Sequence, residues 1–160
     1  MPKDNNIKIL ISACLLGERV RYDGKINKLE DPLIMQWQQK KWLLPVCPEV
    51  CGGLATPRAA AEIQVDGSIK TASGEDVSVA FKLGAQKTLQ LALENKVKVA
   101  ILTEKSPSCG SSLRYDGSFN RTLVNGEGCT AKLLRAHNIA VFNQFNLADA
   151  QAYLQAINDK

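Results

Sequence analysis

The sequence predicts a three-layer α/β fold of the Rossmann-like kind, with a mainly parallel sheet, as a single domain over residues 1–160. Short apolar runs without turn residues recur along the chain, as in strands that are buried on both faces of a parallel sheet. Segments with helical periodicity lie between these runs. The length of 160 residues, 45% of them hydrophobic, is sufficient for one domain with a buried core.

Four apolar runs are the predicted strands of the sheet. They are KILISA at 8–13, WLLPVC at 42–47, VKVAILT at 97–103 and IAVFN at 139–143. A smaller hairpin is predicted at 62–70, because Asp66 and Gly67 form a strong turn signal between two short extended segments.

Helices are predicted in four segments, at 31–42, 75–95, 129–138 and from about Leu147. The first has a clear start, since Asp31 can cap it and Pro32 suits the first helical position. Two stretches rich in Gly, Pro, Asn and Asp, 48–58 and 114–128, are predicted to be loops rather than helices or strands.

Charge and cysteine content narrow the classes of function. A net charge of +4 and a pI near 8.8, with Lys and Arg spread along the chain, permit an anionic small molecule or RNA as partner. No apolar run approaches the length of a membrane span, so no membrane partner is expected. Five cysteines, an odd number without a regular framework, indicate a reducing cytoplasm rather than a disulfide scaffold.

Three cysteines follow three of the predicted strands. Cys14, Cys47 and Cys109 each stand at or just beyond the carboxyl end of an apolar run. Because the carboxyl ends of parallel strands share one edge of a sheet, neighbouring strands would bring these thiolates together. Three thiolates indicate a soft metal centre, either zinc or an iron–sulfur cluster. Three protein ligands rather than four are typical of a catalytic centre with one open position.

The remaining cysteines and the single histidine have other expected roles. Cys51 could form a Cys-x3-Cys pair with Cys47 and supply a fourth ligand, but Cys47 is favoured because it lies directly at the strand end. Cys129, in a predicted helix, is expected to be a small buried residue. His137 is expected at a solvent-facing helix end. A chain with one histidine has no obvious base for Ser-His-Asp or Cys-His catalysis.

The tetrapeptide Arg-Tyr-Asp-Gly occurs twice, at 21–24 and 114–117. Each copy follows a strand-end cysteine and precedes an asparagine at the same offset. Asp-Gly turns recur by chance in many loops, but an identity of this length with a matched asparagine favours two related loops that line one site. Arg21 and Arg114 would then be available to anionic groups.

Three segments of the chain carry a family resemblance, namely SACLLGERVRYDGK, PVCPEVCGGLATPRAAAEI and KSPSCGSSLRYDG. They resemble the thiouracil desulfidase family (TudS-type), formerly a bacterial domain of unknown function, and the match spans nearly the whole chain. The resemblance implies a compact α/β fold with a 4Fe-4S cluster held by Cys14, Cys47 and Cys109, one iron being open. It also implies removal of sulfur from thiolated uracil bases or nucleotides. Related proteins act on thiouridine in tRNA, which makes tRNA a second, less favoured partner.

The resemblance assigns roles to residues beside the cysteines. Glu49 resembles the family's catalytic acid/base, which would activate water for attack on the thiocarbonyl carbon. Ser106 matches the family's catalytic serine, although a turn hydroxyl that caps backbone groups is a close alternative. Four residues of the cysteine-bearing loops are the expected substrate-binding residues: Arg21, Arg58, Ser108 and Arg114. Because arginine forks match phosphate, a thionucleotide is favoured over a free base.

Two other classes of function fit the same residues. One is a zinc-dependent or cysteine-dependent sulfur transferase, in which one thiolate is the nucleophile. The other is a nucleotide-binding or RNA-binding module whose cysteines are structural. An iron–sulfur cluster in the purified protein would distinguish a desulfidase from both.

Overall fold

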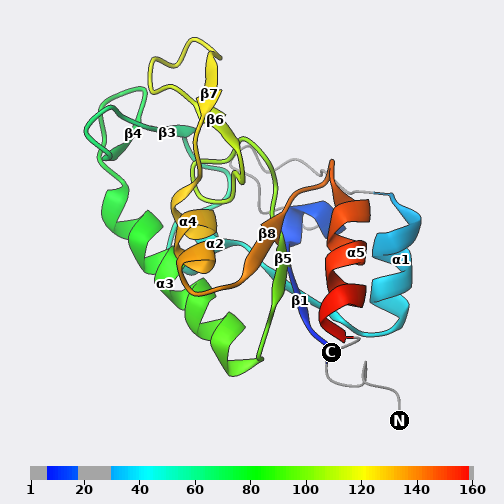
Figure 1. Ribbon diagram of the computed structural model, residues 1–160. Coiled ribbons are helices and arrows are strands. Elements are labelled where there is room, and N and C mark those ends of the chain that lie inside the picture. Colours follow the sequence, from blue (N-terminus) through cyan, green and yellow to red (C-terminus); the bar gives the residue numbers. More distant parts are fainter. Residues whose placement is uncertain (1–6, 18–29, 159–160) are drawn as a thin grey trace.

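A four-stranded parallel sheet forms the centre of the protein (Figure 1). The computed structural model describes residues 7–17 and 30–158. The strands are β1 (Ile9–Ser12), β2 (Leu43–Val46), β5 (Val99–Ile101) and β8 (Ala140–Phe142), in the order β2-β1-β5-β8. All neighbouring pairs are parallel, and every strand lies within its predicted run.

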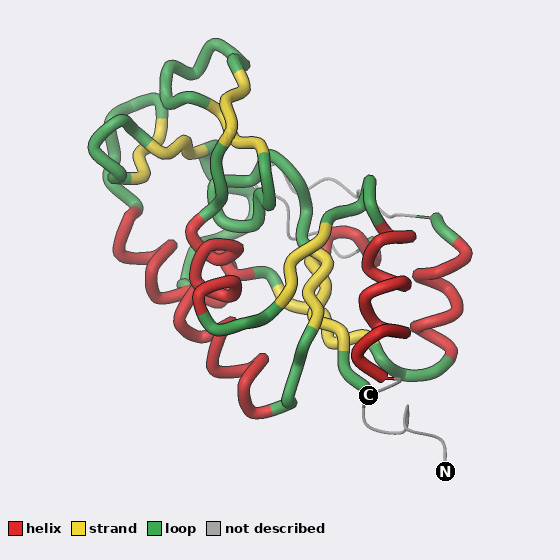
Figure 2. The backbone as a smooth tube through the Cα atoms, in the orientation of Figure 1, coloured by secondary structure: helices red, strands yellow, loops and turns green. Residues whose placement is uncertain are grey.

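Helices cover both faces of this sheet (Figure 2). They are α1 (Pro32–Gln39) and α5 (Leu147–Asn158) on one face, and α3 (Ser78–Glu94) and α4 (Cys129–Ala136) on the other. Side chains of β1 alternate accordingly, since Ile9 and Ile11 pack towards α1 and α5, whereas Leu10 packs towards α3 and α4. The predicted three-layer α/β fold is confirmed.

The strand order changes direction at β1. The chain passes from β1 through α1 to β2 on one side, and later reaches β5 on the other side of β1 directly after α3. Because α1 and α3 lie on opposite faces, a crevice opens at the carboxyl ends of β1 and β5. This is the usual ligand-binding position in open α/β sheets. A 3-10 turn, η1 (Ala13–Leu16), follows β1 at this point.

Two antiparallel hairpins lie beyond the carboxyl end of the sheet (Figure 1). They consist of β3 (Ala61–Ile63) with β4 (Ile69–Thr71), and of β6 (Leu113–Tyr115) with β7 (Leu123–Asn125). The first hairpin confirms the prediction for 62–70. The second lies in 114–128, where the sequence predicts a loop, so that prediction is wrong. Its strands are three residues long and β7 is exposed throughout, so no apolar alternation marks them.

A single helical turn, α2 (Pro48–Cys51), follows β2. The prediction of a continuous loop over 48–58 is therefore wrong for its first four residues. Pro48 takes the first helical position, where its missing N–H costs nothing. The turn packs so closely on α3 that a Cβ atom on Gly52 would overlap the Ala80 carbonyl, and one on Gly84 would overlap the Pro48 carbonyl. Contact between glycines distant in sequence thus allows α2 to form.

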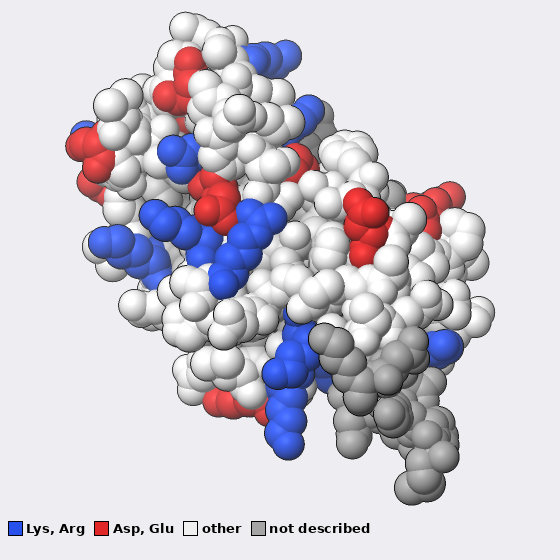
Figure 3. Space-filling view, viewed as in Figure 1, with Lys and Arg blue, Asp and Glu red and all other residues white. Residues whose placement is uncertain are grey.

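The surface carries charges of both signs. On the face drawn in Figure 3, basic side chains lie beside acidic ones, and Arg135 and Glu127 form an ion pair of 2.7 Å. A mixed surface of this kind is weaker evidence for nucleic-acid binding than a uniformly basic one. Among the helices of the described ranges, none is long and apolar enough to cross a membrane.

Candidate metal centre

A cavity of about 470 Å³ opens at the carboxyl ends of β1, β2 and β5. It is lined by the segments that follow these strands, by β3 and by the β6–β7 hairpin. Cys14, Cys47 and Cys109 all line it, together with Glu49 and Ser106. The fold therefore gathers in one cavity the residues for which the sequence predicts metal binding and catalysis.

Cys14 lies in the turn that follows β1, and its side chain is partly buried. Its Sγ is 3.0 Å from Oγ1 of Thr103, which follows the neighbouring strand β5. Ser12, the last residue of β1, accepts the backbone N–H of Thr103 with its Oγ at 2.9 Å. These two contacts join the ends of β1 and β5 and fix the position of Cys14 between them.

Cys47 immediately precedes α2 and is its N-cap residue. Burial raises the pKa of the Cys47 thiol, and the charge of Glu49 raises it further, while the backbone N–H of Val50 and the Arg58 guanidinium partly offset these effects. The thiol is therefore protonated at neutral pH in the metal-free protein. A metal bound here has to displace that proton.

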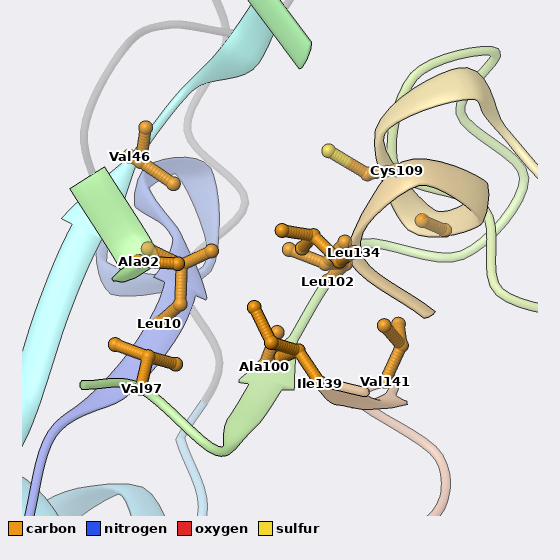
Figure 4. Close-up of a cluster of buried hydrophobic side chains, with 11 residues drawn as sticks. Leu10, Val46, Ala92, Val97, Ala100, Leu102, Cys109, Leu134, Ile139 and Val141 are labelled. Carbon is orange, nitrogen blue, oxygen red and sulfur yellow. The ribbon is translucent and has the colours of Figure 1, made fainter. Parts of the chain in front are cut away.

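Cys109 is the most deeply buried of the three thiols, with 5% of the residue exposed. Figure 4 shows it at the edge of the apolar cluster beneath α4, with its sulfur directed away from that helix. Burial raises the pKa of the Cys109 thiol well above its ordinary value; the Ser12 hydroxyl lowers it, and Cys47, Glu49 and Cys14 raise it. All three thiols therefore belong to the lining of one cavity, where their charges affect one another's ionisation.

The thiols fit a multi-iron cluster better than a single metal ion. Nowhere in residues 7–17 and 30–158 do three His, Cys, Asp or Glu side chains approach closely enough to hold one ion. An iron–sulfur cluster binds each cysteine through a different iron, so its ligands stand farther apart than those of a single zinc ion. A cavity of about 470 Å³ with three soft donors suits such a cluster.

Cys51 and Cys129 are not among the residues that line the cavity. Cys51 packs against the apolar core on the α3 and α4 face of the sheet. Cys129 begins α4 and is partly buried, with its Sγ 3.8 Å from the carbonyl oxygen of Phe81. Cys47 lines the cavity and Cys51 does not, and the choice of Cys47 as the ligand stays a prediction. His137 is exposed at the end of α4, as the sequence predicts.

Glu49 lies in α2 and is held by Arg58. Nε of Arg58 donates to Oε1 of Glu49 at 3.1 Å, and the side chains of the pair are 9% and 17% exposed for Arg58 and Glu49. Arg58 also donates through Nη1 to the Ala55 carbonyl and to Oγ1 of Thr56. The observed partner of Arg58 is thus Glu49, the candidate base. The predicted contact of Arg58 with a substrate stays a prediction.

Ser106 has the turn role that the sequence offers as an alternative, and its catalytic role stays a prediction. Its Oγ accepts the backbone N–H groups of Ser108 at 3.1 Å and Cys109 at 3.0 Å, so it is a turn hydroxyl. It also lines the cavity beside the cysteines. A hydroxyl that accepts two hydrogen bonds still has one hydrogen to donate, which leaves Ser106 able to contact a substrate.

The other predicted substrate-binding residues lie elsewhere. Ser108 is fully buried, with its Oγ 2.7 Å from Oγ1 of Thr130. Arg114 donates to the Glu127 carbonyl at 3.0 Å, and neither Ser108 nor Arg114 belongs to the cavity lining. Arg21 and the first Arg-Tyr-Asp-Gly copy lie outside the described residues. The substrate contacts of these residues, and the pairing of the two related loops, stay predictions.

Three polar residues beside the cysteines escape sequence reasoning: Ser12, Thr103 and Glu104. Each lies at the last position of a strand or shortly after it, as does Cys14. The same argument that places the cysteines at the sheet edge could therefore have included these residues. The cavity lining also includes residues with charged or aromatic side chains that were not predicted, among them Lys105, Tyr115, Phe119 and Arg121.

Comparison with known proteins identifies the family. Residues 9–146 match the 2-thiouracil desulfurase family. The chain belongs to this family. The uncharacterized protein YbbK of Bacillus subtilis (strain 168) is 41% identical over 156 aligned residues, which cover 88% of this chain and 98% of YbbK. The solved structure of the 4Fe-4S-dependent thiouracil desulfidase TudS is 42% identical in sequence and superposes with a TM-score of 0.91. The alignment covers 94% of this chain and 99% of the TudS chain.

The match to the 2-thiouracil desulfurase family includes the whole candidate site. Cys14, Cys47, Glu49, Ser106 and Cys109 all lie within residues 9–146. The family resemblance of the sequence is therefore confirmed, and the similarity to TudS confirms the α/β fold.

Proposed function

We propose that this protein is an iron–sulfur-dependent desulfidase that converts the C=S group of a thiolated uracil base or nucleotide into C=O and releases sulfide. The observation that carries this proposal is the convergence of Cys14, Cys47, Cys109 and Glu49 on one cavity. Membership of the 2-thiouracil desulfurase family and 42% identity to the 4Fe-4S-dependent thiouracil desulfidase TudS support it.

Cys14, Cys47 and Cys109 would hold the cluster as thiolates, and one iron would have no protein ligand. The positions of Cys51 and Cys129 outside the cavity lining support three ligands rather than four. When bound, the cluster supplies a soft Lewis acid for the thiocarbonyl sulfur, which makes the attached carbon more electrophilic. Binding releases the protons that the Cys47 and Cys109 thiols carry in the metal-free protein.

Glu49 is the proposed base. Water must attack the thiocarbonyl carbon, and its proton must pass to an acceptor within reach. Arg58 engages Oε1 of Glu49, so we propose that Oε2 takes the proton of the water. The water oxygen forms the new C–O bond as one water proton passes to Glu49 and the C=S π electron pair moves onto sulfur. The remaining hydroxyl proton then passes to sulfur as the C–S bond breaks, which leaves C=O and hydrosulfide, with the first proton on Glu49. The reaction is a hydrolysis and needs no oxidant or reductant.

The cavity favours a substrate that carries an anionic group. Lys105 and Arg121 line it and are exposed, so they add to the positive charge of Arg58. Tyr115 and Phe119 offer aromatic faces on which a pyrimidine can stack. We therefore place a thionucleotide ahead of a free thiolated base, and tRNA behind both. Comparable kcat/KM values for a base and its nucleotide at low salt would contradict a phosphate site.

Anaerobic purification tests the proposal directly. The protein should be brown, should contain iron and acid-labile sulfide, and should release sulfide from thiouracils or thiouridine nucleotides. In heavy-oxygen water, the product carbonyl should carry the solvent oxygen. A cluster-loaded protein that releases no sulfide from any of these compounds would refute the activity. A chain that binds no iron after reconstitution would refute the cofactor as well.

The alternative functions have less support. A thiol-dependent sulfur transferase needs a thiolate of lowered pKa, whereas burial raises the pKa of Cys47 and of Cys109. A zinc enzyme needs ligands around one ion, which the described residues do not provide. The described ranges contain all five cysteines as free thiols, and a cytoplasmic location stays a proposal.

A further inference from the structure

Glu104 is a buried carboxylate that the proposed chemistry does not use. It lies just beyond β5, beside the cavity, and only 6% of the residue is exposed. Within the described residues, its Oε1 accepts four backbone N–H groups, those of Lys105, Ser111, Ser112 and Leu113, at 2.8 to 3.2 Å. Its Oε2 accepts from the Ser111 and Ser112 hydroxyls and from Nδ2 of Asn143, at 2.7 to 2.9 Å.

These contacts close residues 105–113 into a ring. Lys105 is fastened at its start and Ser111 to Leu113 at its end, both by the same carboxylate. Inside the ring, Ser106 accepts the N–H of Cys109, and the Ser106 carbonyl accepts the N–H of Gly110. Asn143, which follows the edge strand β8, joins the ring to the sheet through Glu104. This side chain therefore ties both ends of the segment that carries Cys109, while backbone hydrogen bonds from residues 126–131 and the Arg135 side chain hold the rest of it.

The ring requires an acceptor that donates nothing. The four backbone N–H groups and the NH2 group of Asn143 can only donate, since Oδ1 of Asn143 already accepts the N–H of Phe145. An ionised carboxylate is the side chain that accepts at both of its oxygens. Burial raises the pKa of Glu104, but hydrogen bonds from Ser112, Leu113 and Ser111 outweigh burial and lower the pKa to about 2. With both oxygens engaged in this way, Glu104 is a poor base for water, in contrast to Glu49.

We propose that Glu104 is the positioning residue of the metal centre, because its carboxylate holds the 105–113 ring and thereby fixes the Cys109 thiol at the cavity before any iron is bound. The role as a metal-centre residue rests on the proposed function, since it takes Cys109 to be a ligand. The ordering of the ring does not, and can be measured on the iron-free chain.

The test uses Glu104→Gln and the exchange variant Glu104→Gln/Asn143→Asp. In Glu104→Gln, the new NH2 group must face either four N–H donors or the Asn143 amide, so the ring cannot keep all its bonds. In the exchange variant, the amide oxygen of the new glutamine keeps the N–H donors, while its NH2 group donates to the new aspartate. The second NH2 hydrogen can go to the Ser112 hydroxyl, which then accepts, and the Ser111 hydroxyl can donate to the new aspartate in place of accepting from Asn143.

Two measurements report whether the 105–113 ring stays closed. On the iron-free chain, the rate at which N-ethylmaleimide labels each cysteine is measured by mass spectrometry, with Cys51 as internal reference. On the iron-loaded chain, the rate of iron loss to a chelator is measured. Glu62→Gln is the matched control, because Glu62 is also a buried glutamate of the cavity wall, 8% exposed, but its Oε1 accepts the N–H groups of Gly117 and Phe119 in the β6–β7 hairpin rather than those of the 105–113 ring.

Glu104→Gln should label Cys109 at least about tenfold faster than wild type, because hydrogen bonds to a charged group are lost and the ring opens more often. Iron loss should accelerate in parallel. The exchange variant should restore both rates to within about threefold of wild type, and Glu62→Gln should leave both unchanged.

Three results would overturn the proposal: unchanged Cys109 labelling in Glu104→Gln, an equal acceleration in Glu62→Gln, or an exchange variant that either fails to fold or labels Cys109 as fast as the single variant. If wild type binds no iron at all, the proposed function fails. The labelling rates on the iron-free chain still decide whether Glu104 holds the ring.

Discussion

At the residue scale, the ligand assignment depends on which thiols reach the cavity. Cys14→Ser, Cys47→Ser and Cys109→Ser should each lose most of the bound iron, because a hydroxyl is a poor ligand for an iron–sulfur cluster. Cys51→Ala and Cys129→Ala should keep it, since neither residue lines the cavity. Iron and acid-labile sulfide per chain, after anaerobic reconstitution, measure the difference. Loss of iron in Cys51→Ala with retention in Cys47→Ser would reverse the assignment.

Also at the residue scale, a substitution of Glu49 tests catalysis separately from cluster binding. Glu49→Gln keeps the shape of the side chain and removes the basic oxygen, so the cluster spectrum should stay intact. Its kcat should fall at least about a hundredfold, the lower range for a general acid–base group. Glu127→Gln is a control, because Glu127 pairs with Arg135 away from the cavity. Wild-type turnover in Glu49→Gln, or loss of its cluster, would mean that Glu49 is not the base.

At the element scale, the packing of α2 on α3 sets the position of Cys47 and Glu49. Gly84→Ala places a methyl group against the Pro48 carbonyl, so α2 must move. Overpacking of this kind typically costs about 1–3 kcal/mol of stability. We expect a lower free energy of unfolding in urea, and a kcat that falls more than KM changes, since α2 carries the proposed base.

The exposed face of the same helix supplies the control for this prediction. Gln86 is exposed on α3, so Gln86→Ala should leave the free energy of unfolding and kcat near the wild-type values. If Gly84→Ala is as stable and as active as Gln86→Ala, the close contact between α2 and α3 does not position the site.

At the scale of the whole molecule, Glu104 links stability to pH. Its pKa is lowered from 4.5 to about 2 in the folded protein, so the unfolded chain takes up this proton at a higher pH than the folded chain. The stabilisation by ionised Glu104 is therefore complete above the pKa that Glu104 has in the unfolded chain. It is lost as the pH falls towards the pKa of Glu104 in the folded protein. A shift of this size corresponds to about 3 kcal/mol at neutral pH.

The comparison of wild type with Glu104→Gln isolates this contribution. The difference in their free energies of unfolding, measured on iron-free protein, should be constant near neutral pH and should shrink from about pH 5 downwards. Urea denaturation at a series of pH values measures it. A difference that stays constant down to about pH 3 would show that Glu104 does not account for the acid sensitivity.

Local sequence patterns determined the strands, most helices and the places of the cysteines. A strand buried on both faces is a continuous apolar run, and its last residue can be read directly, which is why Cys14, Cys47 and Cys109 were predicted at one edge of the sheet. The hairpin at 62–70 has an equally local signal in Asp66 and Gly67. These features depend on neighbours in the chain, and periodicity reports on such neighbours.

Only the tertiary structure decided how the site is held together. The helical turn α2 depends on Gly84, the Glu49 carboxylate on Arg58, and the 105–113 ring on Asn143. Each is a contact between residues that are distant in sequence or joined through an irregular loop, and no periodicity marks it. Side-chain hydrogen bonds form where the folded backbone brings a donor and an acceptor together. Nothing in the sequence distinguishes Glu104 from other glutamates, because Asn143 lies beside it only after the sheet has formed.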